Sequence, residues 1–265
     1  MNIQEYKDSK KELYERFAET VKNILGISIA QEKYHLQQIQ YRAKNIGSLQ
    51  EKLKNLSVVD SDKIEEEIKD LAGCRIIFYY NNDVTRFIQS GIIRDNFDVD
   101  YKRSKIFYHN KDADSANAQY TANHYLVKLK PEKTFLPEYQ DFDGLWCEIQ
   151  IHTILNHAWS ETNHDILYKK PQTEGFGENL LNSMGKKLND VMGKYLIPAG
   201  YEFQKIQLDY QHFLEGKTLL NSNIMQKVKD NVDNNVRYEI LERYKEYTLP
   251  HFDNYQDELG NIIRH

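Results

Sequence analysis

The sequence predicts an α/β (α+β) fold, in which helices and strands are interspersed and both ends of the chain are helical. Residues 3–25 carry apolar side chains at helical spacing, whereas residues 71–80 form a short apolar run typical of a buried strand. The stretch 145–170 changes from an alternating to a helical pattern near residue 153, which indicates a strand that leads into a helix. Because this last stretch also carries several polar side chains, we expect a functional site around it.

The composition excludes several classes of protein. Of the 265 residues, 28% are charged, and the mean hydropathy is -0.74; no apolar run is long enough to span a bilayer. The first residues lack the apolar core of a signal peptide. The two cysteines, Cys74 and Cys147, lie in apolar runs and suit buried thiols, so we expect a reducing, cytoplasmic location. A net charge of -5 argues against a protein that coats nucleic acid, although a local basic groove is compatible with it.

Two helices are predicted at the amino-terminal end. The apolar stripe over residues 3–25 stops at Gly26, where we expect the first helix to end. A second helix is expected over residues 30–41, and its inward side chains would be Tyr34, Leu36 and Ile39.

A basic segment follows the second predicted helix. Arg42 and Lys44 alternate as on an extended chain, and Ser48 can cap a helix that carries Lys52. Two cations on one side of an extended segment, next to a hydroxyl group and a further lysine, would surround a polyphosphate. An exposed loop and helix without any ligand has the same pattern, and the spacing alone favours that simpler interpretation.

One charge interrupts the apolar strand predicted over residues 71–80. Arg75 stands inside this run, and Asp70 stands just before it. An unpaired charge in a buried strand is too costly, so Arg75 must be paired or functional. The two residues could pair with each other. Alternatively, Asp70 holds a metal ion and Arg75 holds phosphate, since magnesium needs few protein carboxylates when a substrate supplies phosphate oxygens.

A helix, a basic loop and a second strand are predicted in the middle of the chain. Apolar residues at helical spacing predict the helix over residues 83–97, and the polar segment 101–119 is expected to form a loop. The densest basic cluster of the chain opens this loop and consists of Lys102, Arg103 and Lys105. A strand over residues 120–130 follows, with Tyr120 and His124 four residues apart where it begins.

The strand that begins near residue 146 has one polar face. That face carries Glu148, Gln150 and His152, and Thr153 can cap the helix that follows. On one side of this helix the ring-bearing residues are His157, His164 and Tyr168. A strand with a carboxylate that leads into such a helix is a plausible half of a phosphate-handling site.

The last third of the chain is predicted to be helical. We expect helices over residues 180–196 and 201–214, separated by a break at Pro198. The predicted organisation is one domain over residues 1–215, followed by a helical extension over residues 216–265, to which the sequence assigns no function.

Five segments of the chain form an ordered set of motifs. They are Arg42-x-Lys44 with Ser48 and Lys52, then Asp70-Leu-Ala-Gly-Cys-Arg75, then Tyr120-x-x-x-His124, then Glu148-Ile-Gln-Ile-His-Thr153, and finally Trp159 through His164 to Tyr168-Lys169. Each motif alone is weak, but the five in this order resemble the synthetase domain of the RelA/SpoT family of pyrophosphokinases. The resemblance covers roughly residues 35–170.

The resemblance implies a nucleotidyltransferase-like mixed β-sheet flanked by helices. It also implies transfer of the β,γ-pyrophosphate of ATP to a ribose 3′-hydroxyl. Carried over position by position, the ATP-binding residues would be Arg42, Lys44, Ser48, Lys52 and Arg75.

The catalytic residues that the resemblance implies are two carboxylates and an amide. Asp70 would hold Mg²⁺, Glu148 would act as the base or as a second metal ligand, and Gln150 would orient Glu148. This set suits the reaction, because phosphoryl transfer needs charge neutralised on phosphate oxygens and a hydroxyl held in line. A carboxylate is ionised at neutral pH and can accept the hydroxyl proton once it is positioned.

The acceptor side follows from the same resemblance. Tyr120 would stack on the acceptor base, and His124 would contact the acceptor's phosphates. A tRNA acceptor would need a basic patch beside this pocket. The candidates are the N-terminal helix, with Lys7, Lys10, Lys11 and Arg16, and the segment that contains Lys102 and Lys105. Stacking on Tyr120 does not name the acceptor, because every base has a π-face.

Several departures from the family pattern lie on the acceptor side. The family usually has Asn-Gly where this chain has Ala118-Gln119, Ser where it has Ala122, Arg where it has His152 and Glu where it has Asn163. With the donor motifs kept, the chain is similar to small, stand-alone members. Its HAWSETNHD segment is closer to toxic synthetases, which modify the 3′ end of tRNA or make adenine alarmones and act with an antitoxin protein.

Other interpretations stay open. The chain could be a housekeeping (p)ppGpp synthetase that uses GDP or GTP, or a non-catalytic binding or antitoxin module on the same fold. A metal phosphohydrolase would use His157 and the pair His164-Asp165 as ligands. Finally, His124, His157 and Tyr168 could be ordinary core residues.

Overall fold

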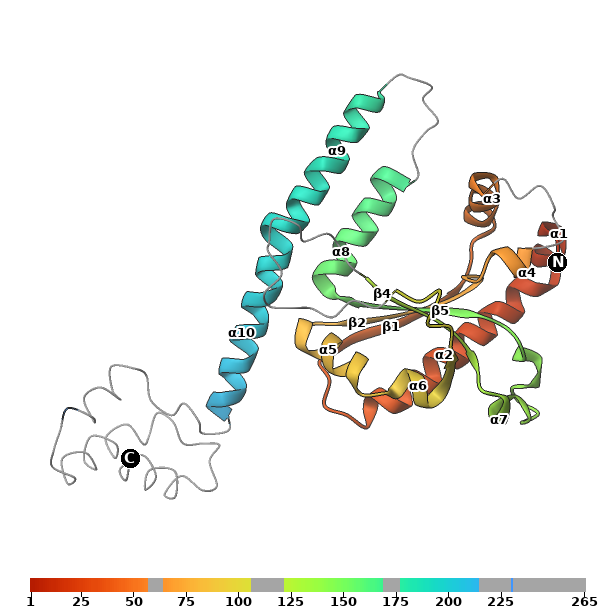
Figure 1. Cartoon of the computed structure of the whole chain (residues 1–265), viewed down its shortest axis with the longest axis horizontal. Coiled ribbons are helices and arrows are strands. Elements are labelled where there is room, and N and C mark those ends of the chain that lie inside the picture. The colour runs from red at the N-terminus through yellow and green to blue at the C-terminus, as the bar shows by residue number, and fades with distance from the viewer. Residues whose placement is uncertain (57–63, 106–121, 169–176, 215–229, 231–265) are drawn as a thin grey trace. The chain divides into compact units, whose positions relative to one another are not determined.

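A five-stranded mixed sheet organises the structure (Figure 1), a computed structural model that describes residues 1–56, 64–105, 122–168, 177–214 and 230. The strands lie in the order β1-β2-β5-β4-β3. Their bounds are Leu36–Ala43 (β1), Ala72–Phe78 (β2), Phe97–Val99 (β3), Asn123–Leu129 (β4) and Cys147–Thr153 (β5). The backbone divides into two units, Met1–Tyr201 and Glu202–His265, and the sheet belongs to the first. The predicted mixed sheet with flanking helices is thereby confirmed.

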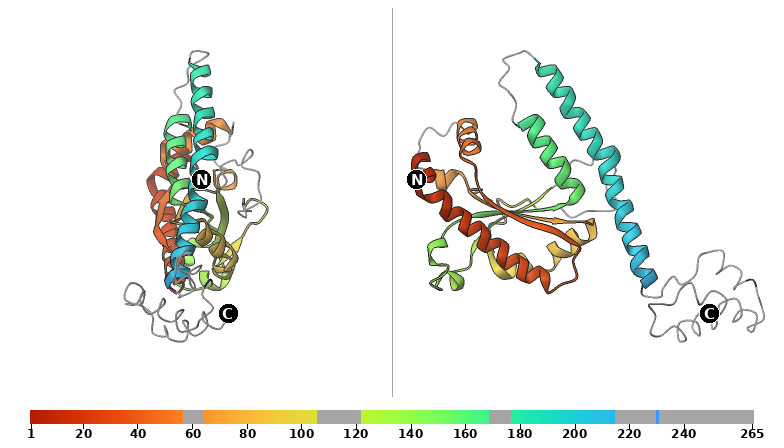
Figure 2. Two further views of the ribbon diagram at one scale, coloured as in Figure 1. Left: turned by 90° about the vertical axis from the view of Figure 1, so that its left-hand side faces the viewer. Right: turned by 180° about the vertical axis from the view of Figure 1, so that it is seen from behind.

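Helices cover both faces of this sheet. In Figure 1 and from behind in Figure 2, α2 runs along one face, whereas α3 and α8 stand on the other. The helices of the first half are α1 (Ile3–Glu5), α2 (Lys11–Ala30), α3 (Ile46–Asn55), α4 (Ile64–Glu67), α5 (Asn81–Gln89) and α6 (Ile92–Asn96), with a π-helical turn over Tyr6–Lys10. Those of the second half are α7 (Pro131–Thr134), α8 (Ile154–Asn163), α9 (Glu178–Val191) and α10 (Ile197–Leu214), with π-helical turns over His164–Tyr168 and Met192–Leu196.

The main core lies between α2 and the sheet. One face of α2 buries apolar side chains at helical spacing, and the opposed face of the sheet contributes the alternate residues of its central strands. The buried residues of α2 include Phe17, Val21, Leu25 and Ile29. Those of β2 and β5 include Cys74, Ile76, Cys147, Ile149 and Ile151. Because α2 and its core occupy this face, the polar side chains of the central strands are directed to the opposite face.

The predicted helix over residues 30–41 is wrong. The chain forms β1 there, which pairs antiparallel with β2 from Leu36 opposite Phe78 to Ala43 opposite Ala72. This pairing is a contact between distant segments, and it outweighs a weak local helical pattern. The expected stop at Gly26 is also wrong: α2 continues to Ala30, because Ile29 extends its buried stripe.

Three smaller expectations are corrected as well. The cap of α3 is Asn45, whose side chain accepts a hydrogen bond from the Gly47 amide at 2.8 Å, so Ser48 lies inside the first turn. The predicted helix over residues 83–97 is split at Gly91, which has a φ of 82° that glycine adopts without strain. The helix does not break at Pro198, because a π-helical turn just before it changes the hydrogen-bond pattern where proline cannot donate.

Other elements are found as expected. β2 lies within the strand predicted over residues 71–80, and β4 lies within the one predicted over residues 120–130, of which residues 120–121 are outside the described residues. Thr153 caps α8 by accepting a hydrogen bond from the Asn156 amide at 3.3 Å. None of the helices in the described ranges is long and apolar enough to cross a membrane. The predicted extension over residues 216–265 lies outside the described residues except for Asp230, and the boundary after residue 215 stays a prediction.

Candidate active site

The register of the sheet places five of the predicted site residues in two neighbouring rows. One row runs across four strands and consists of Gln40, Arg75, Gln150 and His124. The other consists of Arg42, Gly73, Glu148 and Leu126. Paired residues of adjacent strands point to the same face of a sheet. Gly73 adds no side chain between Arg42 and Glu148, so the second row leaves open space on that face.

Asp70 is the centre of the first cluster. Its Oδ2 accepts a hydrogen bond of 2.7 Å from the Lys44 ammonium, and the Lys52 ammonium lies 3.0 Å from Oδ1. Burial alone would raise the pKa of Asp70, but these two cations outweigh it and hold the pKa below its usual range. The carboxylate is therefore ionised at neutral pH and neutralises part of the charge of both lysines.

The loop geometry explains why these three residues meet. Lys44 follows the last residue of β1, and its amide donates a hydrogen bond of 2.8 Å to the Leu71 carbonyl just before β2. Asp70 precedes Leu71, which places it beside Lys44. Lys52 reaches the same carboxylate from α3, where it lies one helical turn after Ser48.

Glu148 is the centre of the second cluster. Its Oε2 accepts a hydrogen bond of 2.7 Å from the Gln150 amide, and its Oε1 lies 3.1 Å from Nδ1 of His124. Burial would raise the pKa of Glu148, but the hydrogen bonds from His124 and Gln150 outweigh this effect and lower the pKa. Since an ionised carboxylate can only accept hydrogen bonds, His124 donates from Nδ1.

Arg75 connects the second cluster to α8. Its Nε donates a hydrogen bond of 3.0 Å to Oε1 of Gln150, and its Nη1 lies 3.1 Å from Nδ1 of His157 and also contacts Glu161. His157 and Glu161 are one turn apart on α8, so they hold the guanidinium together. The suggested pair between Asp70 and Arg75 is therefore wrong, because Asp70 bonds Lys44 and Lys52 instead.

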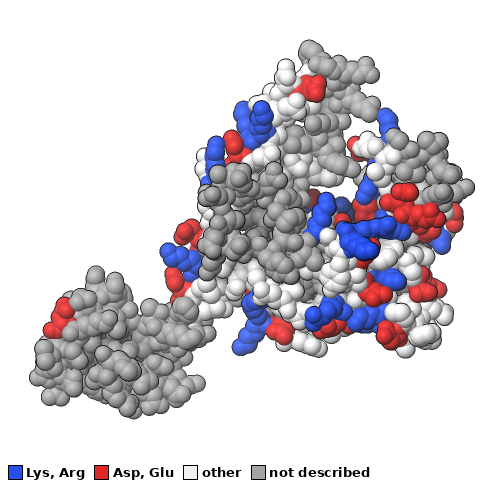
Figure 3. Space-filling view, in the orientation of Figure 1, with Lys and Arg blue, Asp and Glu red and all other residues white. Residues whose placement is uncertain are grey.

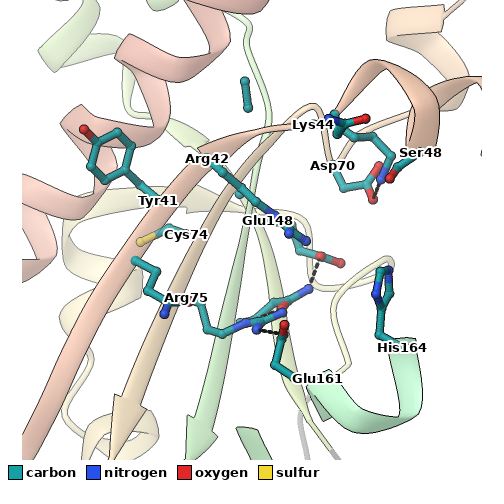
Figure 4. A pocket seen from close by; sticks show the side chains of 15 residues that line it. Tyr41, Arg42, Lys44, Ser48, Asp70, Cys74, Arg75, Glu148, Glu161 and His164 are labelled. Atoms are coloured by element: carbon teal, nitrogen blue, oxygen red, sulfur yellow. Dashed lines mark hydrogen bonds and ion pairs between the residues drawn. The ribbon is translucent and has the colours of Figure 1, made fainter. Parts of the chain in front are cut away.

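Both clusters line one cavity of about 510 Å³, a size typical of small-molecule sites. Figure 4 shows Arg42, Lys44, Ser48, Asp70, Arg75, Glu148, Glu161 and His164 around it. All predicted donor-side and catalytic residues line this cavity, except for Lys52, which joins through its ion pair with Asp70. Sequence reasoning missed Glu161, although its spacing of four residues from His157 was visible.

The acceptor side is described only in part. Tyr120 lies outside the described residues, whereas Lys105 pairs with His124 through both backbone hydrogen bonds, each 2.8 Å. Lys102 lies in the turn before Lys105 and is exposed. His152 is buried close to His124, with a ring-centroid distance of 6.5 Å. Burial, followed by the Arg75 charge, lowers the pKa of His152 to about 3, so this ring is neutral.

The carboxylates fit a magnesium ion that arrives with a polyphosphate. Oδ1 of Asp70 is buried and faces the Lys52 ammonium at 3.0 Å without a hydrogen bond of good geometry, so a metal ion can replace this cation. Glu148 faces the same cavity. Among the described residues, no group of three or more His, Cys, Asp or Glu side chains is placed to hold a metal ion. Magnesium commonly uses one or two carboxylates plus substrate phosphates, which is the set available here.

The arrangement also bears on the phosphohydrolase interpretation. Nδ1 of His157 faces the Arg75 guanidinium, which is a hydrogen-bond donor and repels a cation. Burial and then the Arg75 charge lower the pKa of His157, so the neutral ring accepts this hydrogen bond. His157 thus supports an arginine here and is not available through Nδ1 as a metal ligand.

Comparisons with known proteins identify the family and the fold. The profile described as "Region found in RelA / SpoT proteins" matches residues 41–173. No curated protein matches the chain. Small alarmone synthetase 1 from Bacillus subtilis is similar in fold, with a TM-score of 0.59, 19% identity and coverage of 78% of this chain and 99% of that one. A GTP pyrophosphokinase family protein from Streptococcus pneumoniae has a TM-score of 0.58, 18% identity and coverage of 80% and 97%.

The Bacillus subtilis protein is also matched in two bound forms. The structure with its product pppGpp has a TM-score of 0.54, 20% identity and coverage of 75% of this chain and 95% of that one. The structure with AMPCPP has a TM-score of 0.52, 18% identity and coverage of 75% and 94%. The profile match spans half of this chain and contains both carboxylates and every cation predicted to bind the donor. This chain belongs to the RelA/SpoT family of pyrophosphokinases.

Proposed function

We propose that the protein transfers the β,γ-pyrophosphate of ATP to a ribose 3′-hydroxyl, with Mg²⁺ as cofactor. The observation that carries this proposal is that Asp70, two residues before β2, and Glu148, on the adjacent parallel strand β5, line one cavity with Arg42, Lys44 and Arg75. This is one binding region for a triphosphate, a metal ion and an attacking hydroxyl group.

The cationic side chains would bind the donor. Lys44 and Lys52 now pair with Asp70, and phosphate oxygens can replace the carboxylate as their partner. Arg42 and Arg75 stand at the neighbouring positions of the sheet rows, where they would hold the rest of ATP. Mg²⁺ at Asp70 would neutralise the charge on the phosphate oxygens during transfer.

Glu148 would act as the base. It is ionised, and its direction is set by hydrogen bonds from Gln150 and His124. It would accept the proton of the 3′-hydroxyl, whose oxygen bonds to the β-phosphorus. The bond from that phosphorus to the α,β-bridging oxygen then breaks, and AMP leaves.

For the acceptor, we propose the 3′ end of tRNA or a purine nucleotide, in a toxic synthetase that acts with a neutralising antitoxin protein. The support is that His152 stands where the family usually has an arginine, and this histidine is buried and neutral. The acceptor side thus has one cation fewer than the usual family pattern. A site with fewer cations suits a single phosphodiester better than a free di- or triphosphate, so within this proposal it favours the tRNA 3′ end over a purine nucleotide.

A labelling experiment tests both levels of this proposal. The protein is incubated with γ-labelled ATP and Mg²⁺, and GDP, GTP, ADP, ATP or bulk tRNA is offered in turn. Label on tRNA or on an adenine nucleotide supports the toxic synthetase, whereas label on GDP or GTP alone indicates a housekeeping alarmone synthetase. Label on none of them contradicts the transferase function and favours a non-catalytic module.

A surface prediction addresses a tRNA acceptor. Basic and acidic side chains are interspersed over the face seen in Figure 3, so a tRNA would need a local basic patch. Reversing Lys102 and Lys105 to Glu is expected to lower tRNA labelling by about tenfold, and to reduce its salt dependence, because phosphate contacts are lost. The measurement is the initial labelling rate across a salt series.

The matched control reverses two exposed lysines of α9, Lys186 and Lys187, to Glu. This control changes the net charge by the same amount away from the backbone pair of Lys105 and His124. Equal losses in both double variants would mean that the Lys102–Lys105 segment is not the acceptor patch.

A second prediction concerns the support of Arg75. Glu161→Gln is expected to raise KM for ATP, by less than about tenfold because the Glu161 side chain is 52% exposed and its ion pair is screened. His157 and Gln150 still accept hydrogen bonds from Arg75 in this variant. Steady-state kinetics with Glu178→Gln, an exposed change on α9, is the comparison. A KM unchanged in both variants would show that Glu161 does not support the donor site.

A further inference from the structure

Tyr6 is a buried polar residue with no role in the reaction described so far. It lies in the π-helical turn before α2, its side chain is fully buried, and its hydroxyl donates a hydrogen bond of 2.8 Å to the Lys44 carbonyl. π-helical turns are rare in proteins, and those that occur often lie at functional sites. The contact joins residues 38 positions apart, so it attaches the amino-terminal helix directly to the donor side of the cavity.

Lys44 is held at three points, and Tyr6 supplies one of them. The Lys44 amide donates to the Leu71 carbonyl, and the Lys44 ammonium donates to Asp70. The Lys44 carbonyl would have no hydrogen-bond partner in the described structure without the Tyr6 hydroxyl. Lys44 also immediately precedes Asn45, the cap of α3, so the same contact affects the position of Lys52.

The amino-terminal turn is itself anchored. The Asn2 side chain accepts a hydrogen bond of 2.8 Å from the Glu5 amide, and the Asn2 carbonyl accepts one of 2.9 Å from the Tyr6 amide. The Tyr6 ring packs against the Tyr14 ring, with centroids 6.1 Å apart. Burial, followed by the Asp70 charge, raises the pKa of Tyr6, so the phenol keeps its proton and stays a donor.

We infer that Tyr6 is a positioning residue of the donor half-site, which fixes Lys44 and the start of α3 for binding of ATP phosphates. This inference rests on the proposed function, and it adds the amino-terminal helix to the donor site. The ring of Tyr6 stabilises the helix by packing, whereas its hydroxyl acts on the site. The two contributions can be separated by removing the oxygen alone.

The test compares Tyr6→Phe with Tyr14→Phe in the full chain. Tyr14 is also buried, and its hydroxyl donates a hydrogen bond of 2.9 Å to Oε1 of Glu65, which does not line the donor cavity. Each variant loses one hydroxyl from the same helical segment. The dissociation constant of a non-hydrolysable ATP analogue with Mg²⁺ is measured by calorimetry, and Tm is measured alongside it.

Tyr6→Phe is expected to raise this dissociation constant by about fivefold, since Lys44 loses one of its three fixed points. In turnover, KM for ATP should rise, and KM for the acceptor should stay unchanged. Tyr14→Phe should lower Tm to a similar extent. Its dissociation constant for the analogue and its KM for ATP should stay as in the wild type. The inference about Tyr6 is overturned if Tyr6→Phe binds the analogue as tightly as the wild type, or if both variants lose affinity equally. Neither result contradicts the proposed function.

Two further outcomes are distinguishable. If the wild type does not bind the analogue, the proposed function and this inference fall together. If Tyr6→Phe does not fold, Asn2→Ala replaces it, because this change removes the side-chain cap that seats Tyr6 and keeps the phenol. A rise in the dissociation constant for Asn2→Ala supports the inference, and an unchanged value overturns it.

Discussion

Replacing Glu148 with Gln is expected to lower kcat about 10³-fold, a loss typical of removing a general base. The substitution keeps the shape of the side chain, and Gln150 and His124 can still bond to it, so the fold should be preserved. An amide cannot accept the 3′-hydroxyl proton. The measurement is the rate of label transfer from ATP to the acceptor, at saturating concentrations of both.

Binding measurements make this prediction specific. The dissociation constant of a non-hydrolysable ATP analogue should change by less than about threefold in Glu148→Gln, because the donor-side cations are intact. Glu132→Gln, an exposed change on α7, is the control and should retain full activity. If Glu148→Gln also abolished analogue binding, Glu148 would belong to the donor site as a metal ligand. If transfer continued at the wild-type rate, another group would be the base.

Replacing Asp70 with Asn is expected to have opposite effects on binding and on catalysis. In the empty site the Asp70 carboxylate pairs with the Lys44 and Lys52 ammonium groups. Asparagine has no charge, so both cations become fully available to phosphate. The ATP analogue should therefore bind about fivefold more tightly than in the wild type when Mg²⁺ is left out.

With magnesium present, the wild type should bind the analogue more tightly than Asp70→Asn. Mg²⁺ should improve binding of the analogue to the wild type and leave the Asp70→Asn variant unchanged, since the carboxylate ligand is missing. The rate of transfer should fall on the order of 10³-fold, because the phosphate charge is no longer neutralised at this position. Calorimetric titrations with and without Mg²⁺ provide the comparison.

A charge-neutralising change away from the cavity serves as the control for Asp70→Asn. Asp190→Asn on α9 removes one carboxylate from an exposed ion pair with Lys194 and should change neither titration. Tighter magnesium-free binding in both variants would point to a general effect of net charge. Weaker magnesium-free binding in Asp70→Asn would mean that Asp70 organises the two lysines more than it neutralises them.

Much of the candidate site could be predicted from local sequence, and its internal contacts could not. The strand with Glu148 and Gln150, the strand with Arg75 and the helix capped by Thr153 were predicted correctly, because strand alternation and capping are local properties. The partners of Arg75 were not, since Gln150 and Glu161 lie 75 and 86 residues away. No periodicity encodes a contact of that separation.

The errors in the fold have two origins. Residues 36–41 belong to the predicted helix and become part of β1 because β2 provides a partner along its edge, whereas the extended chain expected at Arg42 is found. Ser48 was a reasonable cap by residue type, but the chain turns from β1 into α3 three residues earlier, at Asn45. For β1 the pairing with β2 decided the conformation, and for α3 the cap was decided by the side chain of Asn45.

The order of the five motifs was enough to predict the class of fold, the family and the side chains that line the cavity proposed as the donor site, because each motif carries its chemistry within a few residues. The tertiary structure decided which of these side chains touch. It paired Asp70 with two lysines, linked Glu148 through Gln150 to Arg75, and brought Tyr6 to the backbone of Lys44. The physical reason is that these contacts depend on strand register and helix packing, which arise only when segments distant in sequence bury their apolar faces together.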